Sequence, residues 1–241
     1  LIPILLGFII PILFIIGNVV YEFDRIDFEK VLDLTSNTFI VSLIASSIII
    51  FIAVYFQFLK RIIKNKILTV FNEAISLTYA LPGAVIGLSL IIMFTSFPLK
   101  SEFLIGSFIV LIYAYVMRYM AVGISPLKSS FEKHPSSYDD TADNLGMGPL
   151  KLFKSIHLPI NKSAIAIAFL ITFVDIIKEL PITLILRPFN FDTLAVQTYE
   201  YAIEEMIPKS SIYSLTIVMM GIILLIFLKK IVNKEIDVSR D

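Results

Sequence analysis

The sequence predicts an all-helical integral membrane protein with six spans. Of 241 residues, 57% are apolar and only 17% are charged, and the mean hydropathy is +0.88; soluble domains carry about 25% charged residues. A helix that crosses a bilayer needs roughly 20 mainly apolar residues. Six such runs occur, at 2–20, 39–59, 73–94, 103–123, 161–177 and 212–228. None alternates polar with apolar residues as barrel strands do, so helices are favoured.

The first run is interpreted as a span and not as a signal peptide. It has neither a basic n-region nor a small-residue cleavage site, and Pro3 and Pro11 lie within it. The chain begins at Leu1, already in apolar sequence and without a methionine. We therefore expect its natural start to lie elsewhere.

The third span is interrupted. Tyr79, Pro82 and Gly83 lie inside it, and Pro98 follows its end. Broken helices often line the path of a transporter, because freed backbone groups need protein or water partners. Packing kinks are at least as common, so both interpretations stay open.

Basic residues are asymmetrically placed around the spans. Fourteen lie after span two, around the loop between spans four and five, and after span six, whereas six lie on the other side. Basic residues near span ends are retained in the cytoplasm, so both termini are expected there. The net charge is zero and no basic patch occurs, which argues against nucleic-acid binding. Cysteine is absent, which excludes disulfides and thiol chemistry.

Residues 134–159 form the main part of the long cytoplasmic loop between spans four and five, and they contain residues typical of helix starts and ends. Ser136 or Ser137 is predicted to cap a short helix, with Asp139 and Asp140 completing a capping box, and Gly146 to end it. Its expected apolar face consists of Tyr138, Ala142 and Leu145.

A second short helix is expected after Gly148 and Pro149. Its apolar side is expected to hold Leu150, Phe153 and Ile156 or His157. Two helices joined by a glycine hinge could lie along a membrane surface or dock in the groove of a partner, and spacing alone does not separate these alternatives.

The loop carries a motif at fixed spacing. Asp140-Thr141-Ala142 is followed by three residues, Gly146, nine residues and then Ile156-His157-Leu158-Pro159. This resembles the EAA loop of binding-protein-dependent ABC importer permeases, whose pattern is EAA, three residues, G, nine residues and I-x-L-P. The chain departs from it in Asp140 and Thr141, which replace Glu and Ala.

The resemblance implies a type I permease fold whose loop seats in a cytoplasmic ATPase dimer. It implies that Asp140 caps the docking helix and contacts the ATPase, that Gly146 permits a sharp turn, and that Pro159 sets the entry to span five. The chain has no G-x-x-x-x-G-K-[ST] loop. We therefore expect a transport subunit and not an enzyme, with no cofactor of its own and with ATP and Mg²⁺ bound by a separate ATPase.

The resemblance also implies a bacterial inner-membrane location and three further partners: an extracytoplasmic binding protein, the lipid bilayer and a second permease half. That half is either fused to this one or a second copy, and the sequence looks most like a C-terminal half.

The segment after span five supplies candidates for an external gate: Asp175, Lys178, Glu179, Pro181 and Arg187. Asp175 can pair with Lys178 or lie near Glu179 one turn on, and interfacial anchoring is the alternative interpretation. The run 178–195, KELPITLILRPFNFDTLA, resembles the external stretch of ferric iron ABC permeases. This resemblance is what points to iron.

An amphipathic helix is expected from residue 196 to 207. This segment offers oxygen ligands that suit Fe(III), so a transient metal site is considered at Tyr199, Glu200, Tyr201, Glu204 and Glu205. A solvated acidic face, or a docking surface for a binding protein, is the alternative. We assign no resident metal.

Several functional alternatives remain at this stage. Thiamine, polyamine or phosphonate import competes with iron import inside the same class. A secondary transporter or channel would use Asp175 and Glu179 as ion sites, and a membrane scaffold or sensor would use the loop only to recruit a partner.

Overall fold

The computed structural model describes residues 2–96 and 105–238, with side chains as far as Val232. Within these residues the secondary structure is helical throughout and contains no strand, in agreement with the all-helical prediction. Pro98 and the first two residues of the expected fourth span lie outside the described residues.

Four helices are long and apolar enough to cross a bilayer: Ile2–Tyr21, α3 (Phe28–Ile63), α6 (Phe108–Lys133) and the Ile207–Val232 part of α13 (Ile207–Val238). Two more segments qualify only as pairs of helices that meet at a bend, Lys66–Ala80 with Gly83–Ser96 and Pro149–Ile160 with Lys162–Ile177. The described residues thus hold four to six candidate spans.

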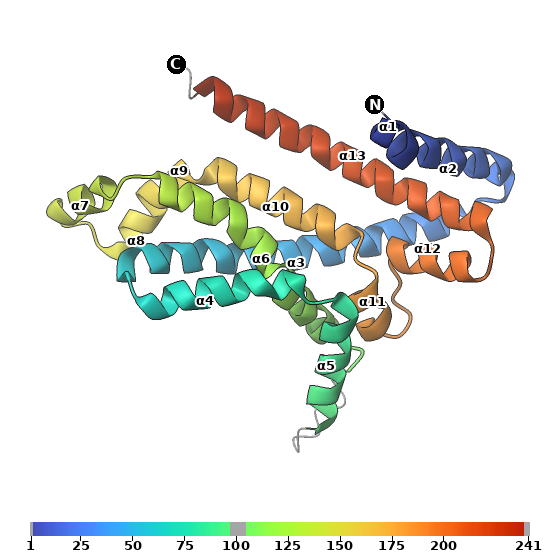
Figure 1. Ribbon diagram of the computed structural model, residues 1–241, viewed down its shortest axis with the longest axis horizontal. Helices are drawn as coiled ribbons and strands as arrows, with labels where there is room; N and C mark the ends of the chain where they lie inside the picture. Colours follow the sequence, from blue (N-terminus) through green and yellow to red (C-terminus); the bar gives the residue numbers. More distant parts are fainter. Residues whose placement is uncertain (1, 97–104, 239–241) are drawn as a thin grey trace. The chain divides into compact units, whose positions relative to one another are not determined.

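Shorter elements complete the chain, and Figure 1 follows them in order. Ile2–Tyr21 consists of α1 (Ile2–Ile4), η1 (Leu5–Ile9) and α2 (Ile10–Tyr21), and η2 (Phe23–Arg25) follows. The others are α4 (Lys66–Leu77), η3 (Thr78–Ala80), α5 (Gly83–Ser96), α7 (Ser137–Asn144), α8 (Pro149–Leu152), η5 (Phe153–His157), α9 (Leu158–Ile160), α10 (Lys162–Ile177), α11 (Pro181–Leu186) and α12 (Leu194–Ile203).

The chain forms two compact units. Unit 1 comprises Leu1–Leu43, Gly83–Ala114 and Val174–Leu224, and unit 2 comprises Ile44–Pro82, Tyr115–Phe173 and Leu225–Asp241. Helices α3, α6, α10 and α13 therefore each contribute to both units.

Unit 1 packs around Leu34, Leu194, Ile212 and Tyr213. The start of α12 is held to α3, because the backbone N–H of Leu194 donates to Thr38 Oγ1 at 2.9 Å. Helices α5 and α11 approach closely at Gly87, where an added Cβ would lie 3.2 Å from Ile185 Cγ2. Small residues permit such close contact between helices in membranes.

Unit 2 packs around Phe58, Phe131, Ala142 and Leu152. These residues come from α3, α6, α7 and α8, so the predicted loop shares one core with the long helices. This explains why α6 continues to Lys133, ten residues past the expected end of span four at 123: Phe131 on its last turns is buried in that core.

The interruption expected in span three is present. Helix α4 and the single turn η3 end at Ala80, and α5 begins at Gly83. The carbonyl oxygen of Leu81 accepts a hydrogen bond of 2.9 Å from Arg118 Nη1 on α6. The Arg118 guanidinium also lies 6.0 Å from the ring centre of Tyr79 and 5.7 Å from that of Tyr119. Arg118 therefore satisfies a carbonyl at the break.

Candidate functional site

The helix that carries the start of the motif ends in a glycine turn. Gly146 has φ +68°, a left-handed conformation that glycine adopts without strain. The N–H of Gly146 donates to Asp143 O and the N–H of Met147 to Ala142 O, both at 2.9 Å. This pair of bonds is the Schellman arrangement, which satisfies the last carbonyls of α7. The predicted stop at Gly146 is confirmed.

The predicted capping box at the start of α7 is wrong. Ser136 holds the cap position, but its side chain makes no capping hydrogen bond. The Asp139 carboxylate, which the box would have used, is bound by other groups. Its partners lie on α3 and in η5, far away in the sequence, and they give a stronger charged interaction than a serine cap.

Arg61 at the end of α3 is the centre of this interaction. Its Nε donates to Asp139 Oδ2 at 2.7 Å. Its Nη1 donates to the carbonyls of Phe131 (2.6 Å) and His134 (3.0 Å), and its Nη2 to that of Pro135 (2.8 Å). The side chains of Arg61 and Asp139 are 13% and 15% exposed. One guanidinium thus ties α3 to the turn between α6 and α7.

His157 closes the other side of Asp139. Its ring is fully buried, and Nε2 lies 2.8 Å from Asp139 Oδ1. The ring stacks on Phe131 at a centroid distance of 5.6 Å and lies 5.3 Å from that of Phe58. Because Asp139 accepts, Nε2 carries the proton in the neutral ring. We call Arg61, Asp139 and His157 the loop clamp.

Burial lowers the pKa of His157, since the apolar surroundings disfavour the imidazolium. Asp139 opposes this through its hydrogen bond and charge, whereas the Arg61 charge lowers the pKa further. The pKa of His134 is also lowered, by burial first and by Arg61 second. The clamp therefore favours the neutral form of His157.

The rest of the motif leads into α10. Ile156 and Leu158 are half-buried, and Pro159 lies in the first turn of α9. At the following bend of 71°, Asn161 is buried. Its Nδ2 donates to His157 O at 2.8 Å, and its Oδ1 accepts from Ser130 at 2.7 Å. These bonds hold the entry to α10 against α6.

The loop also presents an exposed surface. Asp140 and Thr141 are exposed, whereas Ala142 is buried. Of the expected apolar face, Tyr138 and Leu145 point outward, Leu145 with 74% exposure, and Leu150 on α8 is 67% exposed. The expectation that Leu145 packs inward is therefore wrong, because the Schellman turn places Met147 against the core instead.

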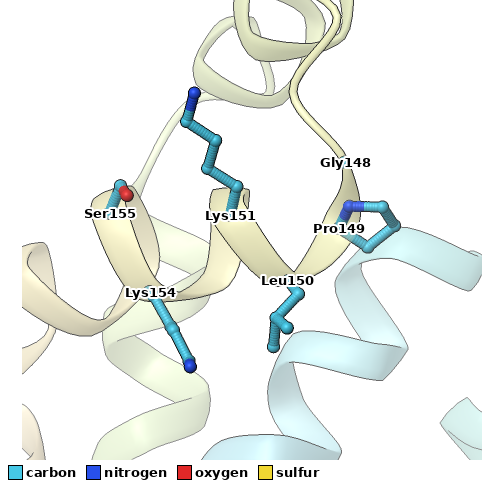
Figure 2. Close-up of a pocket in the computed structure, with 6 residues that line it drawn as sticks. All are labelled: Gly148, Pro149, Leu150, Lys151, Lys154 and Ser155. Carbon is cyan, nitrogen blue, oxygen red and sulfur yellow. The ribbon is translucent and has the colours of Figure 1, made fainter.

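Figure 2 shows a shallow hollow on α8 that includes Leu150 and Pro149, with Lys151 and Lys154 projecting in different directions. Figure 1 places α7 and α8 at the end of unit 2 where α3 meets α4. Apolar, acidic and basic side chains are thus exposed together on a loop whose interior is fixed by the clamp.

The gate candidates lie in unit 1. Asp175 pairs with Lys178 at 2.9 Å, the i, i+3 contact that their spacing predicts. Glu179 is buried, and its Oε1 accepts from the N–H of Ile182 at 3.0 Å. It thereby caps α11, which begins at Pro181. Pro181 starts a new helix here, as expected of a proline at the first helical position.

Arg187 follows α11 and binds two carboxylates. Its Nη1 contacts Asp192, and its Nη2 donates to Glu200 Oε1 at 2.7 Å. We call Arg187, Asp192 and Glu200 the outer network. Tyr201 stacks on Tyr213 at 5.6 Å, whereas the other considered ligands, Tyr199, Glu204 and Glu205, are exposed. Among the described residues no group of three His, Cys, Asp or Glu side chains is placed to hold a metal.

Sequence reasoning missed the loop clamp and the role of Arg118. Arg61 and Arg118 were interpreted only as basic residues on the cytoplasmic side of the membrane. The sequence did contain a signal for the clamp: Arg61 near the end of a span, and Asp139 and His157 placed 18 residues apart in one loop. That signal does not identify partners 78 residues apart.

Comparisons with known proteins agree with the motif. The chain is 28% identical over 205 residues to the Fe(3+)-transport system permease protein FbpB 2 of Haemophilus influenzae, covering 85% of this chain and 40% of that protein. It is 32% identical over 83 residues to the maltose/maltodextrin transport system permease protein MalG of Escherichia coli K12, and 33% over 91 residues to MalG of Yersinia pestis.

The two MalG matches cover 34% and 37% of this chain, and 28% and 30% of those proteins. The chain therefore spans less than half the length of these relatives. No protein-family profile matches it. The relatives are transport permeases and not enzymes, and the apolar helices are those of a multi-pass membrane protein. Over 85% of its length the chain is thus similar in sequence to the permease of an Fe(3+)-transport system, and over about a third of its length to maltose/maltodextrin permeases.

Proposed function

We propose that this chain is a membrane-spanning permease unit of an ATP-driven, binding-protein-dependent importer, and that its cargo is ferric iron. The similarity to an Fe(3+)-transport permease over 85% of the chain supports the cargo. The geometry of residues 134–159 supports the mechanism, and it is the observation that carries the proposal.

In this proposal the chain crosses the bacterial inner membrane six times, with residues 73–94 and 161–177 as the third and fifth spans and both termini in the cytoplasm. It pairs with a second permease unit, fused or identical. ATP and Mg²⁺ bind to a separate dimeric ATPase, and an extracytoplasmic binding protein delivers the cargo.

The loop couples ATP hydrolysis to movement of the membrane helices. Exposed Asp140 and Leu145 contact the ATPase, while the clamp behind them transmits the movement to α3, α6 and α10. Coupling requires that the ATP-bound ATPase binds one permease state more tightly than the other. A loop packed into the same core as the two long helices α3 and α6 is suited to this role, because it cannot move independently of them.

The test is uptake of radiolabelled Fe(III) into proteoliposomes that contain the complete permease, ATPase and binding protein. Thiamine, a polyamine and maltose serve as parallel cargoes. Iron uptake that requires ATP is the expected result. ATP-dependent uptake of another cargo would overturn the iron assignment, and uptake without ATP would overturn the importer assignment.

Two loop variants test the coupling role. Gly146→Pro forces φ to about −65° where the turn needs +68°, and it removes the N–H that bonds Asp143 O. Asp140→Lys reverses the charge of the exposed contact. Both should reduce uptake per ATP hydrolysed while the membrane helices stay folded, whereas Asp33→Lys on the exposed start of α3 should not. Normal coupling in both loop variants would show that the coupling assignment is wrong.

A further inference from the structure

Unit 2 contains an apolar hollow that the proposed function does not use. It has a volume of about 580 Å³, within the range of roughly 300–1,000 Å³ typical of ligand sites. Its wall includes Ile50 of α3, Ile165 and Phe169 of α10, and Phe227 and Ile231 of α13. Ala166 and Leu170 of α10 and two polar residues, Ser47 and Lys162, complete the lining.

Two lysines lie at this hollow. Lys162, in the first turn of α10, is part of the lining. The Nζ of Lys230 lies 6.0 Å from the ring centre of Phe227, which is also in the lining. Both lysines are exposed, and within the part of the chain that the structure describes neither forms an ion pair with a carboxylate.

The hollow lies in helices expected to cross the membrane. Lys162 begins the fifth span, and Lys230 follows the sixth span at 228. The proposed orientation places both positions at the cytoplasmic boundary. The lining residues of α10 and α13 extend from the two lysines into the apolar parts of their helices, so the site has a cationic end and an apolar end.

An amphiphile with an anionic head complements this arrangement. Basic pockets between membrane helices on the cytoplasmic side recognise anionic lipid head groups. We propose that the hollow binds an anionic phospholipid of the cytoplasmic leaflet. Its acyl chain lies against Phe169 and Phe227, and its phosphate lies near Lys162 and Lys230. The choice of leaflet rests on the proposed orientation.

A second permease unit is the competing occupant. To satisfy the same surface it would have to cover the apolar wall and also bring an acidic side chain to each lysine. A zwitterionic lipid would fill the hollow without supplying net negative charge. The two lysines are therefore the feature that selects an anionic lipid over both.

The experiment measures binding of phosphatidylglycerol and phosphatidylcholine to the full chain in its assembled complex, by native mass spectrometry. The expected result is a preference for phosphatidylglycerol. Lys162→Gln and Lys230→Gln should each reduce that preference about fivefold, because one basic residue near a lipid surface contributes about that factor. Lys229→Gln is the matched control: it is exposed on the same helix and, unlike Lys230, has no described contact with a ring of the lining, so it should have little effect.

A second pair of variants tests the apolar end. Ala166→Phe fills the hollow and should reduce binding of both lipids, whereas Ile226→Phe on the exposed side of α13 should not. Wild-type preference for phosphatidylglycerol in the double lysine variant would overturn the proposal. So would the absence of any preference in the wild type.

The protein alternative has its own readout. The chain contains no cysteine, so Phe227→Cys supplies a single site for a cross-linker. Efficient cross-linking to another permease unit would place protein over the hollow and overturn the lipid assignment. The lipid readout is independent of cargo: failure of iron uptake with intact phosphatidylglycerol preference would refute the proposed cargo and leave the lipid site standing.

Discussion

Each unit contains one arginine that organises a polar network, and the two networks differ in what they hold. Arg61 of the loop clamp is 13% exposed and donates to one carboxylate and three backbone carbonyls. Arg187 of the outer network is 27% exposed and binds two carboxylates that are themselves about one third exposed. The first network therefore fixes the backbone between α6 and α7, whereas the second neutralises the charges of Asp192 and Glu200.

This difference shows how the same residue type serves two purposes. Carbonyl contacts immobilise the chain at Phe131, His134 and Pro135, so movement of the loop must involve α3. Ion pairs near solvent are weak and exchange readily with water. We therefore expect substitutions in the loop clamp to have much larger effects than those in the outer network.

The largest effect is expected for Arg61→Leu. It leaves a largely buried Asp139 carboxylate and three carbonyls without their partner, a class of change that costs about 3–5 kcal/mol. Hydrogen exchange of the α7 amides, measured in the complex, should accelerate strongly. Lys60→Leu removes only an ion pair of 3.4 Å to exposed Glu132 and is the control. Equal protection in both variants would mean that the clamp does not hold the loop.

Two neighbouring aspartates sharpen the comparison. Asp139→Asn keeps the shape but removes the charge that Arg61 and His157 bind, and should destabilise the packed loop by about 1.5–3 kcal/mol. Asp140→Asn, on the exposed side, should change stability by less than about 0.5 kcal/mol yet alter ATPase coupling. Asp140→Asn should therefore reduce uptake per ATP hydrolysed without a matching loss of stability in urea unfolding, whereas Asp139→Asn should reduce both. A loss of stability in Asp140→Asn as large as that in Asp139→Asn would contradict this division.

The clamp also predicts a dependence on pH. The pKa of His157 is lowered in the folded state from its usual 6.5. The unpacked loop therefore binds a proton more readily, and the packed loop loses stability as pH falls below about 6.5, levelling off below the lowered pKa. The chain has no natural cysteine, so a spin label can be attached at Leu145→Cys alone. The label should become more mobile as pH is lowered from about 8 to about 5.

The pH dependence should be traceable to the ring. His157→Gln should flatten most of the change in label mobility, while His134→Gln should leave the larger part, since His134 does not contact Asp139 in the clamp. An unchanged slope in His157→Gln would assign the effect to other groups.

A much smaller effect than that of Arg61→Leu is expected for Arg187→Gln in the outer network. Because its ion pairs are about one third exposed, solvent screening limits the loss to about 1 kcal/mol. Protection of the first α12 amides should fall slightly, and the α7 amides should be unaffected. A loss as large as that of Arg61→Leu would remove the distinction between the two networks.

Hydropathy predicted the helices well because membrane spans depend on local composition. Helix α10 begins at Lys162, one residue from the expected start of span five, and the break near Pro82 and the stop at Gly146 follow from the geometry of proline and glycine. These are properties of short windows of sequence.

The loop clamp could not be predicted in this way. The spacing of Asp139 matches a capping box, but its carboxylate instead accepts a hydrogen bond from Arg61, 78 residues away. Likewise Tyr138, Ala142 and Leu145 share one helical face by periodicity, yet only Ala142 is buried. A helix of eight residues gives too few turns for its pattern to determine which side meets the core.

The π-helical turn η5 gives the motif a length requirement. A π turn closes after five residues, not four, which lets Leu152 and His157 both face the core of unit 2. Deleting one residue from 153–157 would rotate everything after it by about 100° and turn His157 away from Asp139. Loss of one codon in this stretch should therefore harm the protein more than most substitutions in it. The number of residues between Gly146 and Ile156, nine, is thus fixed by the need to place His157 beside Asp139.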